Sequence, residues 1–216
     1  MTAPEVRSAR LSERRRWLSV STSLVLGLLI LGSSSGVASA DDDMPFLKGD
    51  VQKCDAPTMH LKRPHDGWQF VDLVKMRRKA EGAGEDTKGY KTLRFRLWFG
   101  SKRAEAFVWS WVDEENREQP LATDAFAMFK AAQLKAAFVK PKLKKPKLVK
   151  FGKRTGVLIS IQGTLAAGTK KPHAILSAVC IRAEDKTIAV IQLECAPKHL
   201  KSLKKDFLKL LKQLKF

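Results

Sequence analysis

Cysteine and histidine are the residue types in this sequence that could supply a nucleophile or hold a metal ion. The three cysteines and four histidines are scattered: Cys54, Cys180, Cys195, His60, His65, His173 and His199. Their spacing matches no metal-binding motif, and no catalytic motif surrounds Cys54 and its neighbour His60. We therefore expect neither a metal site nor a thiol nucleophile.

Acidic residues offer one further candidate for chemistry. Asp113, Glu114 and Glu115 follow Trp109 and Trp111, but this run is typical of a solvated turn after a strand. The sequence contains no G-x-S-x-G elbow, P-loop or H-E-x-x-H motif. We predict that the protein is not an enzyme and uses no cofactor.

Basic residues are far more abundant than acidic ones, and the net charge is +19. Residues 135–154, "KAAFVKPKLKKPKLVKFGKR", contain eight lysines, one arginine and no acid. Pro141 and Pro146 exclude a helix and a central strand, so we expect an extended basic linker. The candidate anion-binding residues are Lys140, Lys142, Lys144, Lys145, Lys147, Lys150, Lys153 and Arg154, with Lys205 and Lys209 near the C-terminus. The alternative is a solvated face that maintains solubility.

The first 40 residues predict export. Three arginines (14–16) precede an apolar run of residues 18–31, and small residues end in Ala38-Ser39-Ala40. We expect cleavage between Ala40 and Asp41, leaving 36 basic against 20 acidic residues and a charge of +16. A retained membrane anchor is the alternative, and the arginines suit either a general secretory or a twin-arginine signal. The protein would then be periplasmic or secreted.

An exported, basic protein meets anionic lipid headgroups and envelope polymers more often than nucleic acid. Arg94, Arg96 and Trp98 alternate with apolar residues on one strand and could form a stacking platform for bases. No RNP-type motif accompanies them, so we expect this face to be covered by a helix or to pack arginine stems around Trp98.

The remaining pattern alternates strands with two helices. We predict an irregular leader over 41–57, a turn at residues 65–67, a mobile loop over 79–89 and a hairpin over 91–112. A helix over 123–138 and three further strands follow. This order indicates an α+β fold with a mainly antiparallel sheet.

The last two strands predict a defined register. If Glu184 and Asp185 form a two-residue hairpin tip, Cys180 pairs with Ala189 and Ala174 with Cys195. Cys180 and Cys195 are then about 20 Å apart along the ladder, too far for a disulfide with each other. Cys54 could bond either one, or all three could remain buried thiols.

The C-terminal segment 197–216 alternates leucines with lysines. Leu200, Leu203, Phe207, Leu210, Leu211 and Leu214 form one apolar stripe. Both membrane-active and core-covering helices have this pattern. Because the preceding hairpin offers an apolar face, we expect this helix to cover the sheet, with its lysines exposed and contributing little to stability.

The chain from about residue 58 to 216 resembles the PsbP-like (DcrB-like) domain family. "MHLKRPHDGWQF" is similar to the opening of these domains, and "TIAVIQLECAPKHLKSLKKDFLKLLKQLKF" to their final strand and helix. The resemblance implies an α/β/α sandwich around an antiparallel sheet and no catalytic apparatus. The family includes a photosystem accessory subunit and a Ran-binding import factor. The lysine excess departs from the family pattern.

These observations predict three regions: a signal peptide (1–40), an irregular leader (41–57) and a PsbP-like domain (58–216). We expect an exported non-catalytic domain that binds an anionic envelope component or partner protein through a basic surface, with peripheral membrane contact. The alternative is an accessory subunit of a larger membrane-associated complex.

Overall fold

The structure is a computed structural model of the 216-residue chain. It describes residues 44–55, 58–112, 128, 131–132, 134–151, 154–166, 171–182 and 187–215. The predicted signal peptide, its cleavage site at Ala40 and Asp41, and the acidic run Asp113–Glu115 lie outside the described residues.

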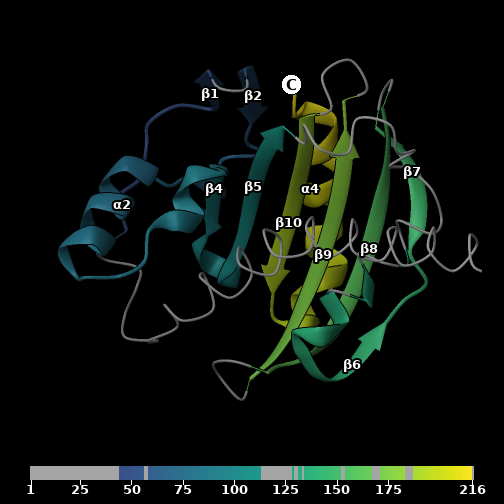
Figure 1. The fold of residues 1–216 in the computed structure, drawn as a ribbon. Helices are drawn as coiled ribbons and strands as arrows, with labels where there is room; N and C mark the ends of the chain where they lie inside the picture. The colour runs from purple at the N-terminus through teal and green to yellow at the C-terminus, as the bar shows by residue number, and fades with distance from the viewer. Residues whose placement is uncertain are drawn as a thin grey trace, which may run out of the picture.

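An antiparallel sheet forms the centre of the described structure (Figure 1). Its strand order is β3-β4-β5-β10-β9-β8-β6, and β7 also pairs with β8. The strands are β3 (Gln69–Phe70), β4 (Leu93–Phe99), β5 (Ala104–Val112), β6 (Phe138–Leu143), β7 (Lys147–Phe151), β8 (Arg154–Leu165), β9 (Pro172–Ile181) and β10 (Thr187–Cys195). The predicted antiparallel α+β fold is confirmed.

The predicted register of the last two strands is also confirmed. Ala189 pairs with Cys180, and Cys195 pairs with Ala174. Every second residue of β9 and β10 therefore points to the same apolar side, as the alternation of the sequence requires.

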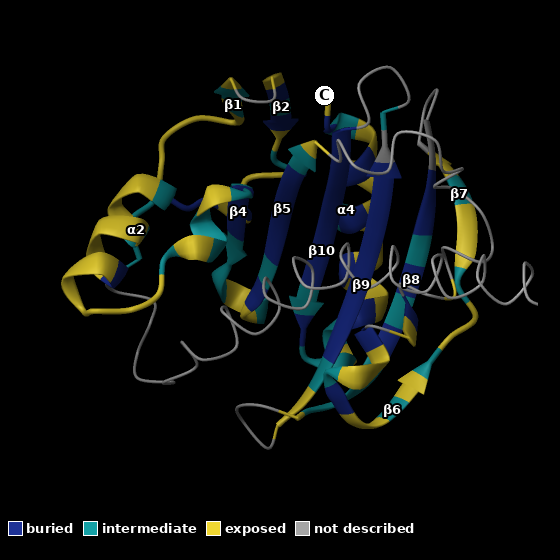
Figure 2. Ribbon diagram, in the orientation of Figure 1, coloured by how far each residue is buried: buried dark blue, intermediate teal, exposed yellow. Residues whose placement is uncertain are grey.

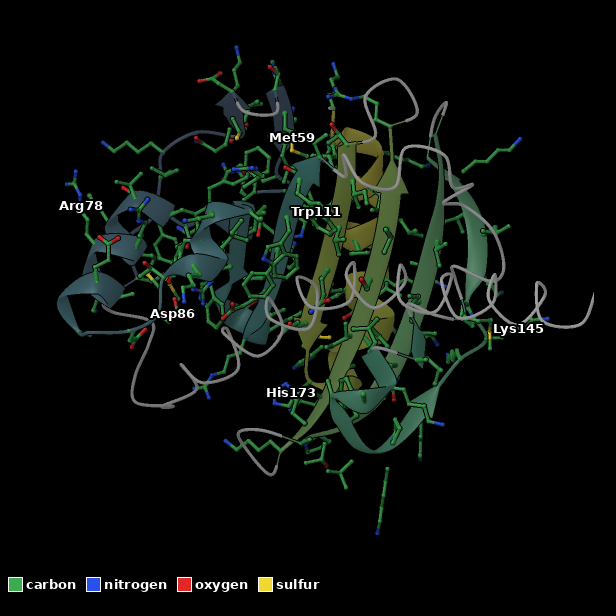
Figure 3. The ribbon with its side chains drawn as sticks, in the orientation of Figure 1. Met59, Arg78, Asp86, Trp111, Lys145 and His173 are labelled. Atoms are coloured by element: carbon green, nitrogen blue, oxygen red, sulfur yellow. The ribbon has the colours of Figure 1, made fainter. Side chains whose placement is uncertain are left out.

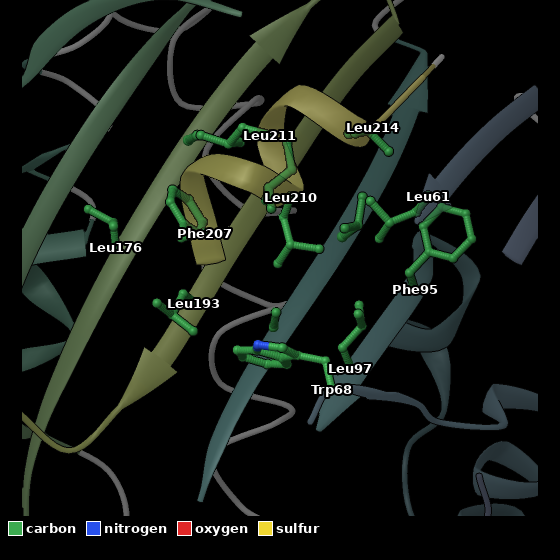
Figure 4. Packing of buried hydrophobic residues seen from close by; sticks show 14 of the residues in the cluster. Leu61, Trp68, Phe95, Leu97, Leu176, Leu193, Phe207, Leu210, Leu211 and Leu214 are labelled. Carbon is green, nitrogen blue, oxygen red and sulfur yellow. The ribbon is translucent and has the colours of Figure 1, made fainter. Parts of the chain in front are cut away.

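Helix α4 (Leu200–Gln213) covers this apolar side (Figure 4). Its stripe is buried in one cluster with Leu176, Ala178 and Leu193 of the sheet. Leu203 and Phe207 are fully buried, whereas the lysines of the helix are exposed. The helix follows β10 through the short 3-10 turn η3 (Pro197–His199), where proline fixes the first turn. The prediction that this segment covers the sheet is confirmed.

Helical residues also lie on the opposite side of the sheet. Ala131 and Leu134 are buried there against Val157, Val179 and Val190. Residues 128, 131–132 and 134–136 are helical, within the range in which the sequence predicts a helix. Helical residues on both sides of the sheet make the sandwich that the resemblance implied.

Three predicted irregular segments are regular in the structure. Residues 51–55 form β1 (Val51–Asp55), which pairs with β2 (Thr58–Lys62). Every second residue of β1 is half-buried, and one of these, Cys54, packs against the core. The start of the expected loop 79–89 belongs to α2 (Leu73–Gly82). Asp72 caps α2, with its carboxylate accepting from the amides of Val74 and Lys75. The 3-10 turn η1 (Lys88–Lys91) lies in the rest of that segment.

The third of these segments is the expected basic linker, which forms the strands β6 and β7. Both strands pair with β8, which is long enough for β6 to use residues 161–165 and β7 residues 154–158. The hydrogen-bonding edge of β8 therefore overrides the low strand propensity of lysine and proline. Figure 2 shows the central strands buried and β6 and β7 more exposed at one edge of the sheet.

The predicted hairpin over 91–112 consists of β4, the 3-10 turn η2 (Gly100–Lys102) and β5. Its alternation fails at one point: the register shifts between Leu93 and Phe95. Phe95 joins the cluster under α4, whereas Leu93 joins the cluster on the opposite side. A bulge moves a residue to the other face in this way.

Candidate functional site

The basic edge of the sheet, which we define as the lysines of β6, β7 and their connection, is the most highly charged part of the described chain. Lys140, Lys142, Lys144, Lys145, Lys147 and Lys150 are all exposed. No acidic residue lies between Asp124 and Glu184 in the sequence, so none occurs on β6, β7, β8 or β9. The lysines of this edge therefore have no acidic neighbours on their own strands.

A bulge in β6 accommodates Pro141, which cannot donate a backbone hydrogen bond. The register with β8 shifts between Val139 and Lys142, and Lys140 has a left-handed backbone with φ of 50°. Pro141 thus lies where no ladder hydrogen bond is needed, at the edge of the sheet. The predicted exclusion of proline from a central strand holds, although the segment is a strand.

The pairing register places two of these lysines on the same side of the sheet as α4. Lys142 pairs with Gln162, which pairs in turn with the buried Ala174 under α4. Lys147 pairs with Leu158, which packs partly against the same cluster. Residues directly opposite each other in a ladder share a face. Lys150 is three residues beyond Lys147, so it points to the opposite side.

Between α4 and these lysines, β8 leaves a strip of the sheet only half-buried. The strip consists of Leu158, Ser160, Gln162 and Thr164, which all face the α4 side. Neighbouring residues of β9 and β10 on the same face are fully buried beneath α4. We call these four positions the β8 strip.

One flank of α4 is fixed to the other end of the sheet. Asp206 accepts hydrogen bonds from Trp68 Nε1 and contacts His65 Nε2, both at 3.1 Å. Lys209 Nζ donates to the backbone carbonyl of Pro64, so this lysine has a structural partner. Lys209 is exposed, as predicted, but this bond gives it a contact within the fold that the sequence did not indicate. The preceding turn brings Pro64 and His65 against the helix.

The opposite flank of α4 therefore faces the β8 strip. At 100° per residue, Lys204 and Leu208 lie on that flank, which we call the inner flank, and Lys201 lies at its outer border. Lys205 and Lys212, only 20° apart, point outward. All of these side chains are exposed. Figure 4 agrees with this orientation, because Leu211 lies toward β9 whereas Leu214 lies toward Leu61 of β2.

The other predicted basic residues have different positions. Lys144 and Lys145 lie in the connection between β6 and β7, and Figure 3 shows Lys145 at the outer edge of the molecule, far from Arg78 of α2. Lys153 and the side chain of Arg154 lie outside the described part of the structure. The predicted anion-binding residues are thus distributed over both sides of the sheet, and the lysines on the inner flank of α4 were missed.

A second ionisable cluster, which sequence reasoning did not find, lies on the sheet side opposite α4. Arg96 of β4 contacts Glu105 of β5 through Nη2 at 2.9 Å and lies over the ring of Phe107. Glu194 of β10 pairs directly with Glu105 in the ladder and accepts from Gln192 Nε2 at 2.6 Å. Two carboxyls on adjacent strands are visible only once the pairing of β5 with β10 is known.

Burial, and then the neighbouring Glu105 carboxylate, raise the pKa of Glu194 from 4.5 to about 7. Burial also raises the pKa of Glu105, against the opposing effect of Arg96. Because the folded pKa of Glu194 exceeds its unfolded value, the native state binds this proton more tightly. Its stabilising contribution is complete below pH 4.5 and is lost as the pH rises to about 7. This contribution is at most roughly 3 kcal/mol, because each pKa unit corresponds to about 1.4 kcal/mol.

The arginines of β4 are held in contacts within the fold. Arg94 Nε donates to Ser110 Oγ at 2.8 Å, and Arg96 is only 8% exposed. Arg96 therefore cannot serve as an open stacking platform for bases, and its guanidinium lies over the ring of Phe107, 5.5 Å from the ring centroid.

The cysteines do not form a catalytic pair with histidine. Cys54 pairs with Met59 and packs toward the core, whereas His60 pairs with Lys53 and faces the other side of the β1–β2 hairpin. The Cys54–His60 nucleophile is thus excluded by the pleat.

All three cysteines are present as thiols in this structure. Cys54 borders the cluster that contains Cys180 and Cys195. Burial, and then Glu194, raise the pKa of Cys195 to about 11. A disulfide from Cys54 to Cys180 or Cys195 stays a prediction.

Clustered metal ligands and a membrane-spanning helix are both missing from the described residues. No group of three or more metal-ligating side chains occurs among them. Within the same ranges, no helix has the length and apolar character needed to cross a bilayer.

Comparisons with known proteins bear on the fold. Cyanobacterial PsbP from Synechocystis sp. PCC 6803 is similar at a TM-score of 0.52 and 11% identity, over 86% of this chain and 98% of that chain. LpqN of Mycobacterium tuberculosis, involved in cell envelope biogenesis, gives 0.48 and 9%, over 73% and 82%. The Ran-binding protein Mog1p of Saccharomyces cerevisiae gives 0.47 and 11%, over 80% and 96%.

Sequence comparison is less informative. No protein family's sequence model matches this chain, and no curated protein matches it. The structural likeness is therefore one of fold, at 11% identity to cyanobacterial PsbP. On these grounds the chain has the PsbP-like fold.

Proposed function

We propose that this chain is an exported, non-catalytic domain that binds an anionic component of the cell envelope through its basic edge. The observation that carries the proposal is the row of exposed lysines on β6 and β7, without an acidic residue on these strands or on β8 and β9. The N-terminal sequence pattern supports export to the periplasm or the medium.

The electrostatics favour a surface ligand. Like charges on adjacent strands repel one another, and an anionic partner relieves that repulsion while its counterions are released. Exposed charges are screened beyond about 10 Å at 0.1 M salt, so the binding should weaken as salt rises.

A binding role rather than a catalytic one is supported by the contacts of the other ionisable groups. Arg96 and Glu105 neutralise each other, and Asp206 joins α4 to Trp68 and His65. These groups already have partners within the fold. The lysines of the basic edge, in contrast, are exposed and have no acidic residue on their own strands.

Flotation with lipid vesicles tests the proposal. The protein should float with vesicles that contain anionic lipid, should not float with zwitterionic vesicles, and should be released by salt. The variant Lys142→Gln/Lys144→Gln/Lys145→Gln should bind more weakly, while Lys75→Gln, on the distant helix α2, should bind like the parent. Equal flotation with both vesicle types, or no effect of the triple change, would contradict the proposal.

A second candidate is an accessory subunit that uses the same edge as a protein interface. It is favoured by two exposed aliphatic side chains on these strands, Val139 at 51% and Leu148 at 44%. A pull-down from native membranes at low and high salt separates the two. A stoichiometric protein that survives high salt favours the subunit, and salt-released lipid or polymer favours the first proposal.

A further inference from the structure

The β8 strip lies between two rows of lysines that come from distant parts of the chain. Lys142 and Lys147 border it at the sheet edge, at the level of Gln162 and Leu158. Lys204 and, at its outer border, Lys201 lie along it on the inner flank of α4. All four are exposed, and the strip between them is half-buried rather than covered.

The strip itself offers neutral polar groups. Ser160 and Gln162 are half-buried on the α4 side of the sheet, with Thr164 two residues further along. The strip from Leu158 to Thr164 extends over about 20 Å at 3.3 Å per residue. It therefore presents a line of hydrogen-bond donors between two lines of positive charge.

Because α4 stands above the sheet, the site suits a flexible linear ligand better than a flat membrane surface. A helix is about 10 Å across, so a flat bilayer resting on α4 would lie about that far from Lys142 and Lys147. This separation is close to the screening length at 0.1 M salt. A single flexible chain, in contrast, can lie along the strip and reach both rows.

The side chains that border the strip select the charge of the ligand. Lysine is a compact point charge and a common ligand of phosphate in proteins, and the described residues that border the strip include no arginine side chain, whose planar fork would hold a carboxylate at two points. From this arrangement we infer that the β8 strip and its two lysine rows form a binding site for a linear phosphate-bearing polymer. The inference rests on the proposed function and specifies its ligand and site.

Two matched variants of the protein purified from its cell test this site. The strip variant is Lys142→Gln/Lys147→Gln/Lys204→Gln. The control variant is Lys150→Gln/Lys198→Gln/Lys205→Gln, which removes the same charge from the opposite side of the sheet, the turn η3 and the outward face of α4. All six lysines are exposed, and equal melting temperatures check that both variants fold.

The probe is inorganic polyphosphate, titrated at several salt concentrations, with anionic vesicles and a carboxylated polysaccharide as comparisons. The strip variant should bind polyphosphate about tenfold more weakly than the control variant. Its slope of log affinity against log salt should fall by about 2, because each lost phosphate contact removes about 0.7. A Ser160→Ala change should weaken binding without altering the slope.

The outcomes separate this inference from the proposed function. Equal losses in the two triple variants, or tighter binding to vesicles or polysaccharide than to polyphosphate, would overturn the inference and leave general anion binding intact. No binding of the parent to any of the three anions would overturn both.

Discussion

Replacing Leu203 with alanine tests whether α4 is part of the core. Leu203 is fully buried between α4 and the sheet, in the cluster with Phe207, Leu210 and Leu193. Removing its three outer carbons leaves a cavity that a helix held at both ends cannot close. Such changes cost about 2–5 kcal/mol of unfolding free energy. At about 2–4 °C per kcal/mol for a chain of this size, the melting temperature should fall by about 4–20 °C.

Leu208→Ala is the matched control on the same helix. Leu208 lies on the flank near the β8 strip and is 37% exposed, so its loss leaves no closed cavity. We expect less than about 1 kcal/mol, partly offset by the higher helix propensity of alanine. Lys205→Gln should stay within about 0.5 kcal/mol. Lys209→Gln should cost about 1 kcal/mol, because its bond to the Pro64 carbonyl is lost.

Thermal melting followed by circular dichroism, with urea unfolding beside it, measures these differences. If Leu203→Ala melts at the same temperature as Leu208→Ala, α4 does not pack as the structure has it. If Leu203→Ala keeps the parent's melting temperature and loses vesicle binding at every salt concentration, α4 is a membrane-inserting helix instead.

Three other measurements follow from the same structure. Glu194→Gln should reduce the loss of stability between about pH 4.5 and 7 and raise the melting temperature at pH 8. The surface change Glu81→Gln should not have this effect on the dependence of melting temperature on pH. If the parent and Glu194→Gln show the same dependence on pH, the pKa of Glu194 is not raised. Iodoacetamide at pH 8 should label Cys54 before Cys195, whose thiol is buried and has a pKa of about 11. A mass lower by two hydrogen atoms in the unreduced protein would reveal the predicted disulfide instead. N-terminal sequencing of the major species from the producing cell should begin at Asp41, and a sequence that begins at Met1 or Thr2 would refute cleavage.

The parts of the fold that sequence predicted are those in which local pattern and tertiary packing agree. The register of β9 with β10 follows from a short turn and an alternation that leaves small and apolar residues on one face. The covering role of α4 follows because its stripe has the helical period and the preceding hairpin needs a partner. In both cases the alternation or helical period of neighbouring residues predicts the same buried face that the tertiary packing requires.

The parts that sequence missed depend on residues far away in the chain. Nothing within "KPKLKKPKLVK" indicates strands, because β6 and β7 exist through the free edge of β8. The carboxyls of Glu105 and Glu194 meet through the pairing of strands that are distant in sequence. Likewise, Lys209 could not be recognised as a structural residue until the turn at Pro64 was placed against α4.

Only part of the site could be predicted, because its geometry also depends on residues that are distant in the chain. Composition identified the lysines of the basic segment, but the pairing register decides that Lys142 and Lys147 share a side and that Lys150 does not. The contribution of Lys201 and Lys204 requires the orientation of α4, which Asp206 and Trp68 fix.

Protection of the sheet edge is the competing explanation for these lysines. Lysine and proline on an outer strand prevent pairing with a second molecule, and Lys140 with Pro141 at the bulge of β6 suits that purpose. Edge protection requires charge only at the free edge, however. It does not account for Lys201 and Lys204, which lie on a helix one layer above the sheet and have no strand to protect. If the lysines only protect the edge, the strip variant and its control should bind polyphosphate equally. If a site lies along β8, the lysines of α4 should be as necessary for binding as those of the sheet edge.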